Sequence, residues 1–144
     1  MRNLIRTLLV AGAAAIATPA SADFYLVVNS GNPQGALTQK EAVDLFMGRS
    51  RSFANGDFAQ VFDLPRDHPQ RAAFYLTLTG MSPAVVNSYW SRLMFSGQNM
   101  PPQAVADEAA MIDSLKHQPG GIGWLPHEPA DKALRTLLVI KDAP

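Results

Sequence analysis

Residues 62–74 read FDLPRDHPQRAAF, and the rest of the chain is organised around this stretch. A short apolar strand that ends near Leu64 runs into a polar turn, and the turn opens a helix. Asp67 and Gln70, three residues apart, have the pattern of a capping box. Pro69 then falls in the first helical turn, where a missing N–H has no cost. The stretch therefore predicts a helix that starts directly after a buried strand.

The same turn is the best candidate binding site in the chain. Arg66 and Arg71 flank the predicted helix start, with Asp67 and Gln70 between them. The amides and the positive dipole end of a helix N-terminus attract anions, and guanidinium groups have donors shaped for carboxylate or phosphate. An oxyanion site formed by these four residues is one interpretation. In the other, the two arginines are solvated or pair with Asp63 and Asp67.

The first 22 residues have the form of a secretory signal peptide. Two arginines precede an apolar run over residues 8–17, and Ala20-Ser21-Ala22 has the A-x-A form of a cleavage site. The apolar run is too short to cross a bilayer as a permanent helix. We therefore expect residues 1–22 to be removed and residues 23–144 to form one domain in a bacterial periplasm.

The composition of residues 23–144 excludes several function classes. Ten Lys and Arg face twelve Asp and Glu, a formal charge of −2, and no basic stripe is present. Nucleic acid is therefore not expected as a partner. The absence of cysteine from the chain excludes a disulfide framework and thiolate metal sites. The length suits one compact domain and is short for two lobes.

Apolar runs alternate with helical patterns along the chain. We expect strands over residues 24–28, 59–64, 103–106, 122–125 and 134–140. Capping residues and glycines or prolines predict helices that start near Thr38, Asp67, Ser82 and Asp107 and end near Gly48, Gly80, Gly97 and Pro119. This alternation predicts an α/β domain with a mixed sheet flanked by helices.

The third predicted helix carries the widest apolar stripe. Its members recur at spacings of three and four: Val85, Val86, Tyr89, Trp90, Leu93 and Met94. We expect it to be the main core helix, with Tyr89 and Trp90 in the core rather than stacked on a ligand.

Recognisable catalytic chemistry is missing from the sequence. His68, His117 and His127 are far apart and have no clustered carboxylates beside them. No nucleophile elbow, phosphate-binding loop or dinucleotide motif follows a predicted strand. Asp67 with His68 is the nearest approach to a catalytic pair, and no motif places a nucleophile beside it. We expect no metal, no cofactor and no enzymatic activity.

Four segments occur in a distinctive order and spacing. They are Leu37-Thr38 with Glu41 and Leu45-Phe46-Met47-Gly48; Arg66-Asp67 with Arg71 and Phe74; Trp90 with Arg92 and Phe95-Ser96-Gly97; and Pro119-Gly120-Gly121-Ile122-Gly123-Trp124. Together they resemble the periplasmic phosphate-binding proteins of ABC transporters. The resemblance implies a type II periplasmic-binding-protein fold, phosphate or a similar oxyanion as ligand, and a membrane transporter or receptor as partner.

Two departures from that family separate the functional hypotheses. His68-Pro69-Gln70 stands where the family has Ser-Gly-Thr, so two hydroxyl donors and one amide donor are missing. The predicted mature chain also has the length of one lobe. One hypothesis is a solute-binding protein that takes phosphate or a similar oxyanion weakly, alone or closed by a second subunit. The alternative is a ligand-free periplasmic adaptor or sensory partner domain of a membrane protein.

Overall fold

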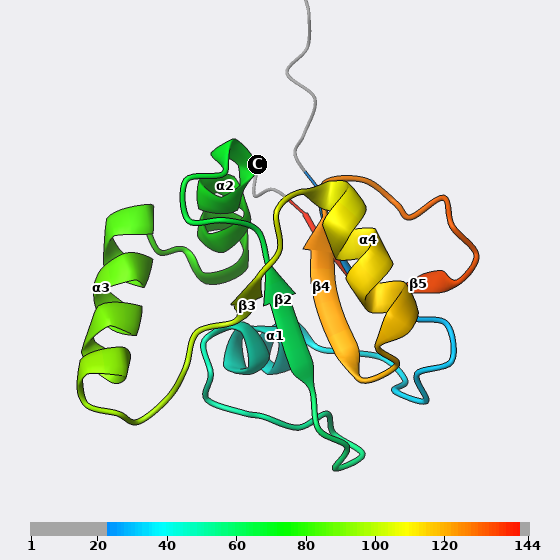
Figure 1. The fold of residues 1–144 in the computed structure, drawn as a ribbon, viewed down its shortest axis with the longest axis horizontal. Coiled ribbons are helices and arrows are strands. Elements are labelled where there is room, and N and C mark those ends of the chain that lie inside the picture. Colours follow the sequence, from blue (N-terminus) through cyan, green and yellow to red (C-terminus); the bar gives the residue numbers. More distant parts are fainter. Residues whose placement is uncertain (1–22, 142–144) are drawn as a thin grey trace, which may run out of the picture.

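The computed structural model describes residues 23–141, and the predicted signal peptide lies outside them. A five-stranded sheet in the order β3-β2-β4-β1-β5 runs through the molecule, with helices around it (Figure 1). Its strands are β1 (Phe24–Asn29), β2 (Gln60–Asp63), β3 (Gln103–Ala104), β4 (Gly121–Leu125) and β5 (Leu134–Ile140). The helices are α1 (Gln39–Phe46), α2 (Pro69–Thr79), α3 (Pro83–Phe95) and α4 (Glu108–His117).

The sheet is mixed, which confirms the predicted architecture. β2 runs parallel to β3 and β4, whereas β1 is antiparallel to β4 and β5. Because β2 and β3 are parallel neighbours, their carboxyl ends meet at one edge of the sheet. The polar turn before α2 follows β2 at this edge, which is where open α/β sheets commonly bind ligands.

β4 shows how the two faces of the sheet are covered. A Cβ atom on Gly123 would overlap the Sδ atom of Met111, so glycine is what allows α4 to lie close to this strand. The next side chain, Trp124, points to the other face and stacks on Phe74 of α2, with 4.5 Å between ring centroids and 6° between planes. Alternation along one strand therefore places α4 and α2 on opposite faces.

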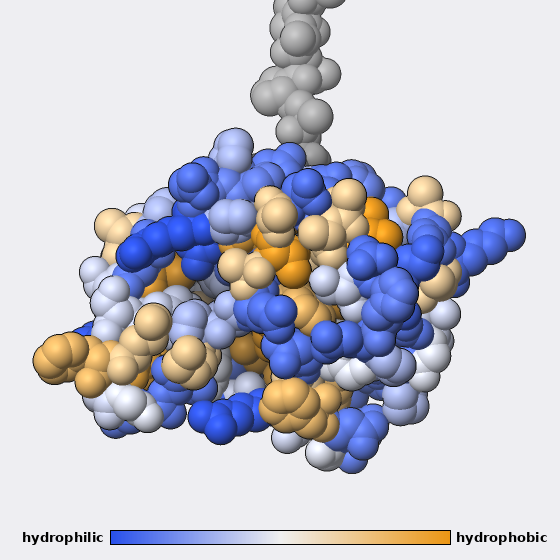
Figure 2. All heavy atoms as spheres, viewed as in Figure 1, coloured by the Kyte–Doolittle hydropathy of each residue, from blue (hydrophilic) through white to orange (hydrophobic). Residues whose placement is uncertain are grey.

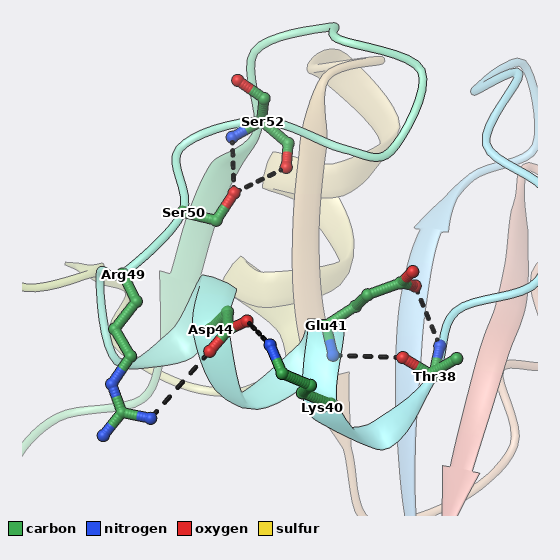
Figure 3. A network of polar contacts seen from close by, with 7 residues as sticks. All are labelled: Thr38, Lys40, Glu41, Asp44, Arg49, Ser50 and Ser52. Atoms are coloured by element: carbon green, nitrogen blue, oxygen red, sulfur yellow. Dashed lines mark hydrogen bonds and ion pairs between the residues drawn. The ribbon is translucent and has the colours of Figure 1, made fainter.

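α1 begins as the sequence predicts (Figure 3). The Thr38 hydroxyl accepts a hydrogen bond from the Glu41 N–H at 3.2 Å, and the Glu41 carboxylate accepts one from the Thr38 N–H at 3.0 Å. This reciprocal pair is a capping box. Asp44 pairs with Lys40 at 2.9 Å on the exposed side of the helix, and Gly48 follows the helix with φ of +71°.

The start of α2 differs from the prediction. The Pro65 carbonyl accepts from the His68 N–H at 2.9 Å, and the helix begins at Pro69. His68 is therefore the N-cap, and its Nδ1 atom accepts from the Gln70 N–H at 3.2 Å. The expected capping box between Asp67 and Gln70 is wrong, because the turn delays the helix by one residue and leaves Asp67 outside it.

α3 is not the main core helix. Val86 and Trp90 are buried, but the side chains of Val85 and Met94 are 51% and 50% exposed. The helix packs against α2 and stands beyond the β3 edge of the sheet (Figure 1). β3 has only two residues, so this edge leaves Val85 and Met94 of the α3 stripe uncovered, while Tyr89 and Leu93 are partly buried against the core. The predicted burial of Trp90 is confirmed.

Candidate functional site

The carboxylate of Asp63, at the end of β2, is the centre of a buried polar network. Its Oδ1 atom accepts from the Leu64 N–H at 2.8 Å and from the Trp124 indole N–H at 2.9 Å. Its Oδ2 atom accepts from the Tyr75 hydroxyl at 2.7 Å and from Arg71 Nε at 3.0 Å. The side chain is 4% exposed. Four donors therefore satisfy the carboxylate and tie β2 to α2 and β4.

The guanidinium of Arg71 is part of this network. Its side chain is 11% exposed, and its guanidinium lies over the Tyr75 ring at 4.8 Å from the centroid. Asn87 of α3 accepts a further, long hydrogen bond from it at 3.4 Å. Burial and the adjacent Asp63 carboxylate together raise the pKa of Tyr75 well above 10.0, which keeps its hydroxyl a donor. Arg71 thus follows the second interpretation of the sequence, an internal ion pair.

The N-terminal amides of α2 are also occupied. Pro69 has no N–H, and the Gln70 N–H donates to His68 Nδ1. The Arg71 N–H donates to the His68 carbonyl at 3.1 Å. The side chains of Asp67 and Gln70 are exposed. The helix end therefore has no unused amide in its first three positions to offer an anion.

A cavity of about 180 Å³ lies beside this helix end, between the turn, α3 and residues 101–104. Arg66 and Arg71 line it, and α3 contributes Asn87 and Ser91. These two α3 residues are one turn apart, so their side chains lie on the same side of the helix. Arg66 is exposed and makes no ion pair within residues 23–141. With Asp63 opposing Arg71, the lining carries one uncompensated positive charge, at Arg66.

The structure therefore brings two of the four predicted site residues to one cavity, Arg66 and Arg71. Asp67 and Gln70 do not line it. Asn87 and Ser91 were missed, although two polar residues four apart on an apolar helix were a usable signal. What the sequence could not provide was the packing of α3 against α2, which alone places those side chains beside Arg66.

Two solved structures share this fold. One is a putative phosphate ABC transporter substrate-binding protein from Clostridium perfringens with bound phosphate, with a TM-score of 0.62, 13% identity and 81% coverage of this chain. The other is an ABC-type phosphate transport receptor from Vibrio cholerae, with a TM-score of 0.59, 16% identity and the same coverage. The chain has the fold of phosphate-transporter substrate-binding proteins. At these identities the likeness is one of fold, and it confirms the fold that the sequence resemblance implied.

The chain is much shorter than either of these two proteins. The chain covers 45% of the Clostridium protein and 46% of the Vibrio protein, so it spans less than half of each. No family model matches the sequence, and no curated protein matches it.

The histidines are dispersed over the described residues. His68 caps α2, His117 lies beside Asp113 on α4 at 3.4 Å, and His127 contacts the Glu108 carboxylate at 3.0 Å. Nowhere in residues 23–141 do three His, Cys, Asp or Glu side chains gather in an arrangement that could hold a metal ion. The cavity beside Arg66 is therefore the feature with the clearest binding chemistry.

Proposed function

We propose that the chain is a solute-binding protein that takes phosphate or a similar small oxyanion, weakly, in the cavity beside Arg66. One observation carries this proposal. Arg66 has no carboxylate partner within the described residues and lines a cavity with Asn87 and Ser91. A guanidinium, an amide and a hydroxyl are donors suited to an oxyanion.

Several features support low affinity. The α2 amides are used within the protein, and Asp63 neutralises Arg71. Arg66 is exposed, and a charge contact in water is weak and screened by salt. We expect micromolar or poorer binding, a free energy of about −8 kcal/mol or less favourable.

We further propose that the protein works in the periplasm beside a membrane transporter or receptor. The sequence of residues 1–22 supports export, and both structural neighbours are described as proteins of phosphate ABC transport. Among residues 23–141, none of the helices combines the length and the hydropathy needed to cross a membrane.

A ligand-free adaptor is the second candidate function, and the Asp63 network favours it. Arg71, near the start of α2, is held by Asp63 at 3.0 Å, and the first free amides of α2 have acceptors within the protein. Such a domain would use the same fold to contact a membrane protein without carrying an ion.

Calorimetry with inorganic phosphate and with sulfate separates these candidates. Arg66→Gln should weaken binding by tenfold or more, whereas Arg92→Gln should leave it unchanged, because Arg92 is an exposed α3 residue that lines no cavity described here. Raised salt should weaken binding by the wild type. Equal binding by wild type and Arg66→Gln would place the site elsewhere. No binding of either anion by the wild type would overturn the proposed oxyanion binding and favour the adaptor.

A further inference from the structure

A second, larger cavity of about 370 Å³ lies between the segment after α1, the start of β2 and the loop that follows α3. It shares Trp90, Met94 and two prolines with the smaller cavity, so α3 contributes to both. Arg51 is the one charged residue in its lining, and no acidic side chain lines it. Its remaining lining is a mixture of apolar side chains, neutral amides and one serine.

Arg51 is held in position at this cavity. Its carbonyl accepts from the Ala59 N–H at 2.9 Å, which fixes its backbone to the entry of β2. Its guanidinium donates to the Asn99 side chain at 3.1 Å, and Asn99 in turn donates to the Gly48 carbonyl at 2.5 Å. A Cβ atom at position 48 would lie 2.6 Å from Asn99 Nδ2, so glycine makes room for this contact.

The guanidinium of Arg51 has unused binding capacity. It makes no ion pair within residues 23–141, and its one side-chain hydrogen bond there is the bond to Asn99. A guanidinium has five N–H donors in a planar fork that matches a carboxylate. Because Asn99 already restrains the side chain, less rotamer freedom is lost when a ligand binds.

The walls of the cavity leave apolar surface in water. Phe58, Met94 and Met100 are 65%, 50% and 74% exposed, and all three line it. Figure 2 shows apolar side chains over the end of α3 and near the lower end of β2, with polar side chains between them. Trp90 closes the inner wall at 5% exposure, and its indole N–H is buried without an acceptor among the described residues. A buried donor without an acceptor is unfavourable.

We propose that this cavity binds a small organic carboxylate with an apolar, preferably aromatic, body. The carboxylate fits the fork of Arg51, and its single charge matches the single charge of the lining. The body covers Phe58 and the two methionines, whose sulfur atoms make favourable contacts with aromatic rings. Inorganic phosphate would satisfy the guanidinium but leave those side chains in water. The inference does not depend on the oxyanion site, because Arg51, Phe58 and Met100 line only the larger cavity and Arg66 lines only the smaller one.

Phenylacetate is the first probe, titrated by calorimetry into the purified protein. Acetate has the carboxylate without the ring, and phenylacetamide has nearly the same shape without the charge. We expect phenylacetate to bind with a Kd below about 1 mM and both matched probes to bind at least tenfold more weakly. No binding of phenylacetate at millimolar concentration, or equal binding of phenylacetamide, would overturn the proposal.

Matched arginine variants locate the site. Arg51→Gln should weaken phenylacetate binding tenfold or more. Arg49→Gln is the control, because Arg49 is a nearby, half-exposed residue that lines neither cavity. Arg66→Gln should also leave phenylacetate binding unchanged, and Arg51→Gln should leave any phosphate binding unchanged. Loss of phenylacetate binding in Arg66→Gln instead of Arg51→Gln would overturn the assignment, whatever the result with phosphate.

The indole N–H resonance of Trp90 gives a second readout of binding. Phenylacetate would not shift this resonance if Arg51 only stabilised the fold. The chain has two tryptophans, so an amide-proton NMR spectrum contains two indole N–H resonances. Trp124 already donates to Asp63 at 2.9 Å, whereas the Trp90 N–H has no acceptor within the described part of the chain. Phenylacetate should shift the Trp90 resonance in the wild type, and the shift should be absent in Arg51→Gln. A titration that leaves the Trp90 resonance in place would contradict binding in this cavity.

Discussion

Asp63→Asn tests whether the side chain of Arg71 stabilises the buried network instead of binding a ligand. The substitution keeps the shape of the side chain but exchanges one acceptor oxygen for an NH₂ group. Two donors approach each oxygen of Asp63 in the native protein. Whichever way the amide turns, one of these pairs of donors therefore meets an NH₂ group instead of an acceptor. Arg71, 11% exposed, also loses its only carboxylate partner within residues 23–141.

The expected cost follows from that geometry. Removing one partner of a buried ion pair leaves an uncompensated charge, and this costs about 3–5 kcal/mol. A small domain has a total stability of about 5–15 kcal/mol, so Asp63→Asn should remove a large part of it. Arg71→Gln should cost less, about 1–3 kcal/mol, because Asp63 then keeps the donors of Leu64, Tyr75 and Trp124.

Urea titration followed by circular dichroism measures these differences for both single variants and the double variant. The double variant should cost less than the sum of the singles, with a coupling of roughly 0.5–3 kcal/mol, since the two residues are in direct contact. A cost below about 1 kcal/mol for Asp63→Asn would equal that of a surface substitution and refute the reasoning. Additive costs would also refute it, because they would mean that the two charges do not stabilise each other.

Three further predictions concern single sites. The pKa of Tyr75 is raised by burial and by Asp63, so its contribution to stability should be complete below pH 10.0, the ordinary pKa, and be lost as pH rises through the higher folded value. Urea midpoints should therefore fall as pH rises above about 10, and Tyr75→Phe should lack this step. Hydrogen bonds from His127 to the Glu128 carbonyl and to Glu108 raise the pKa of His127, so its contribution should be present below pH 6.5 and be lost as pH rises through the folded value. The pair is partly exposed, so His127→Gln should lower stability by less than about 1 kcal/mol at acidic pH and have no effect at alkaline pH. Gly48→Ala should lower the free energy of unfolding by roughly 2–4 kcal/mol in a urea titration, because φ is +71° and the new Cβ would lie 2.6 Å from Asn99 Nδ2. An unchanged free energy would mean that Asn99, which contacts Arg51, is not held firmly in place.

Local chemistry explains which helix boundaries the sequence could predict. Thr38, Ser82 and Asp107 are the N-caps of α1, α3 and α4, as expected, because a side-chain oxygen needs only the amides of the next turn. His68 was missed because Asp67, a commoner capping residue, precedes it and has a glutamine three residues later. Choosing between them required the turn that joins His68 to Pro65.

Periodicity gives the apolar face of a helix but not the surface that covers it. The α3 pattern correctly predicted an amphipathic helix, yet only Val86 and Trp90 are buried. The uncovered members lie beyond the two-residue strand β3, and that edge depends on the strand order. For the same reason, Asn87 and Ser91 could not be assigned to a cavity before the position of α3 was known.

The ion pair of Arg71 marks the limit of sequence reasoning at the site. Pairing with Asp63 was one of two open interpretations, and the residues are only eight apart. The decision depends on Trp124, 61 residues away from Asp63, and on Tyr75, which together with the Leu64 amide supply the other donors. These donors make a buried carboxylate favourable at the end of β2, and the carboxylate then holds the nearest guanidinium.

The distribution of acids supports both proposed anion sites. No Asp or Glu occurs between Asp67 and Asp107, a segment that includes α2, α3 and the loop bordering both cavities. Asp63, the one acid lining either cavity, is paired with Arg71. Within residues 23–141, Arg66 and Arg51 therefore form no ion pair with a lining carboxylate, and salt should weaken anion binding at both. Each lining carries one uncompensated positive charge, so the residues around each arginine must distinguish the two ligands: Asn87 and Ser91 at Arg66, Phe58 and Met100 at Arg51.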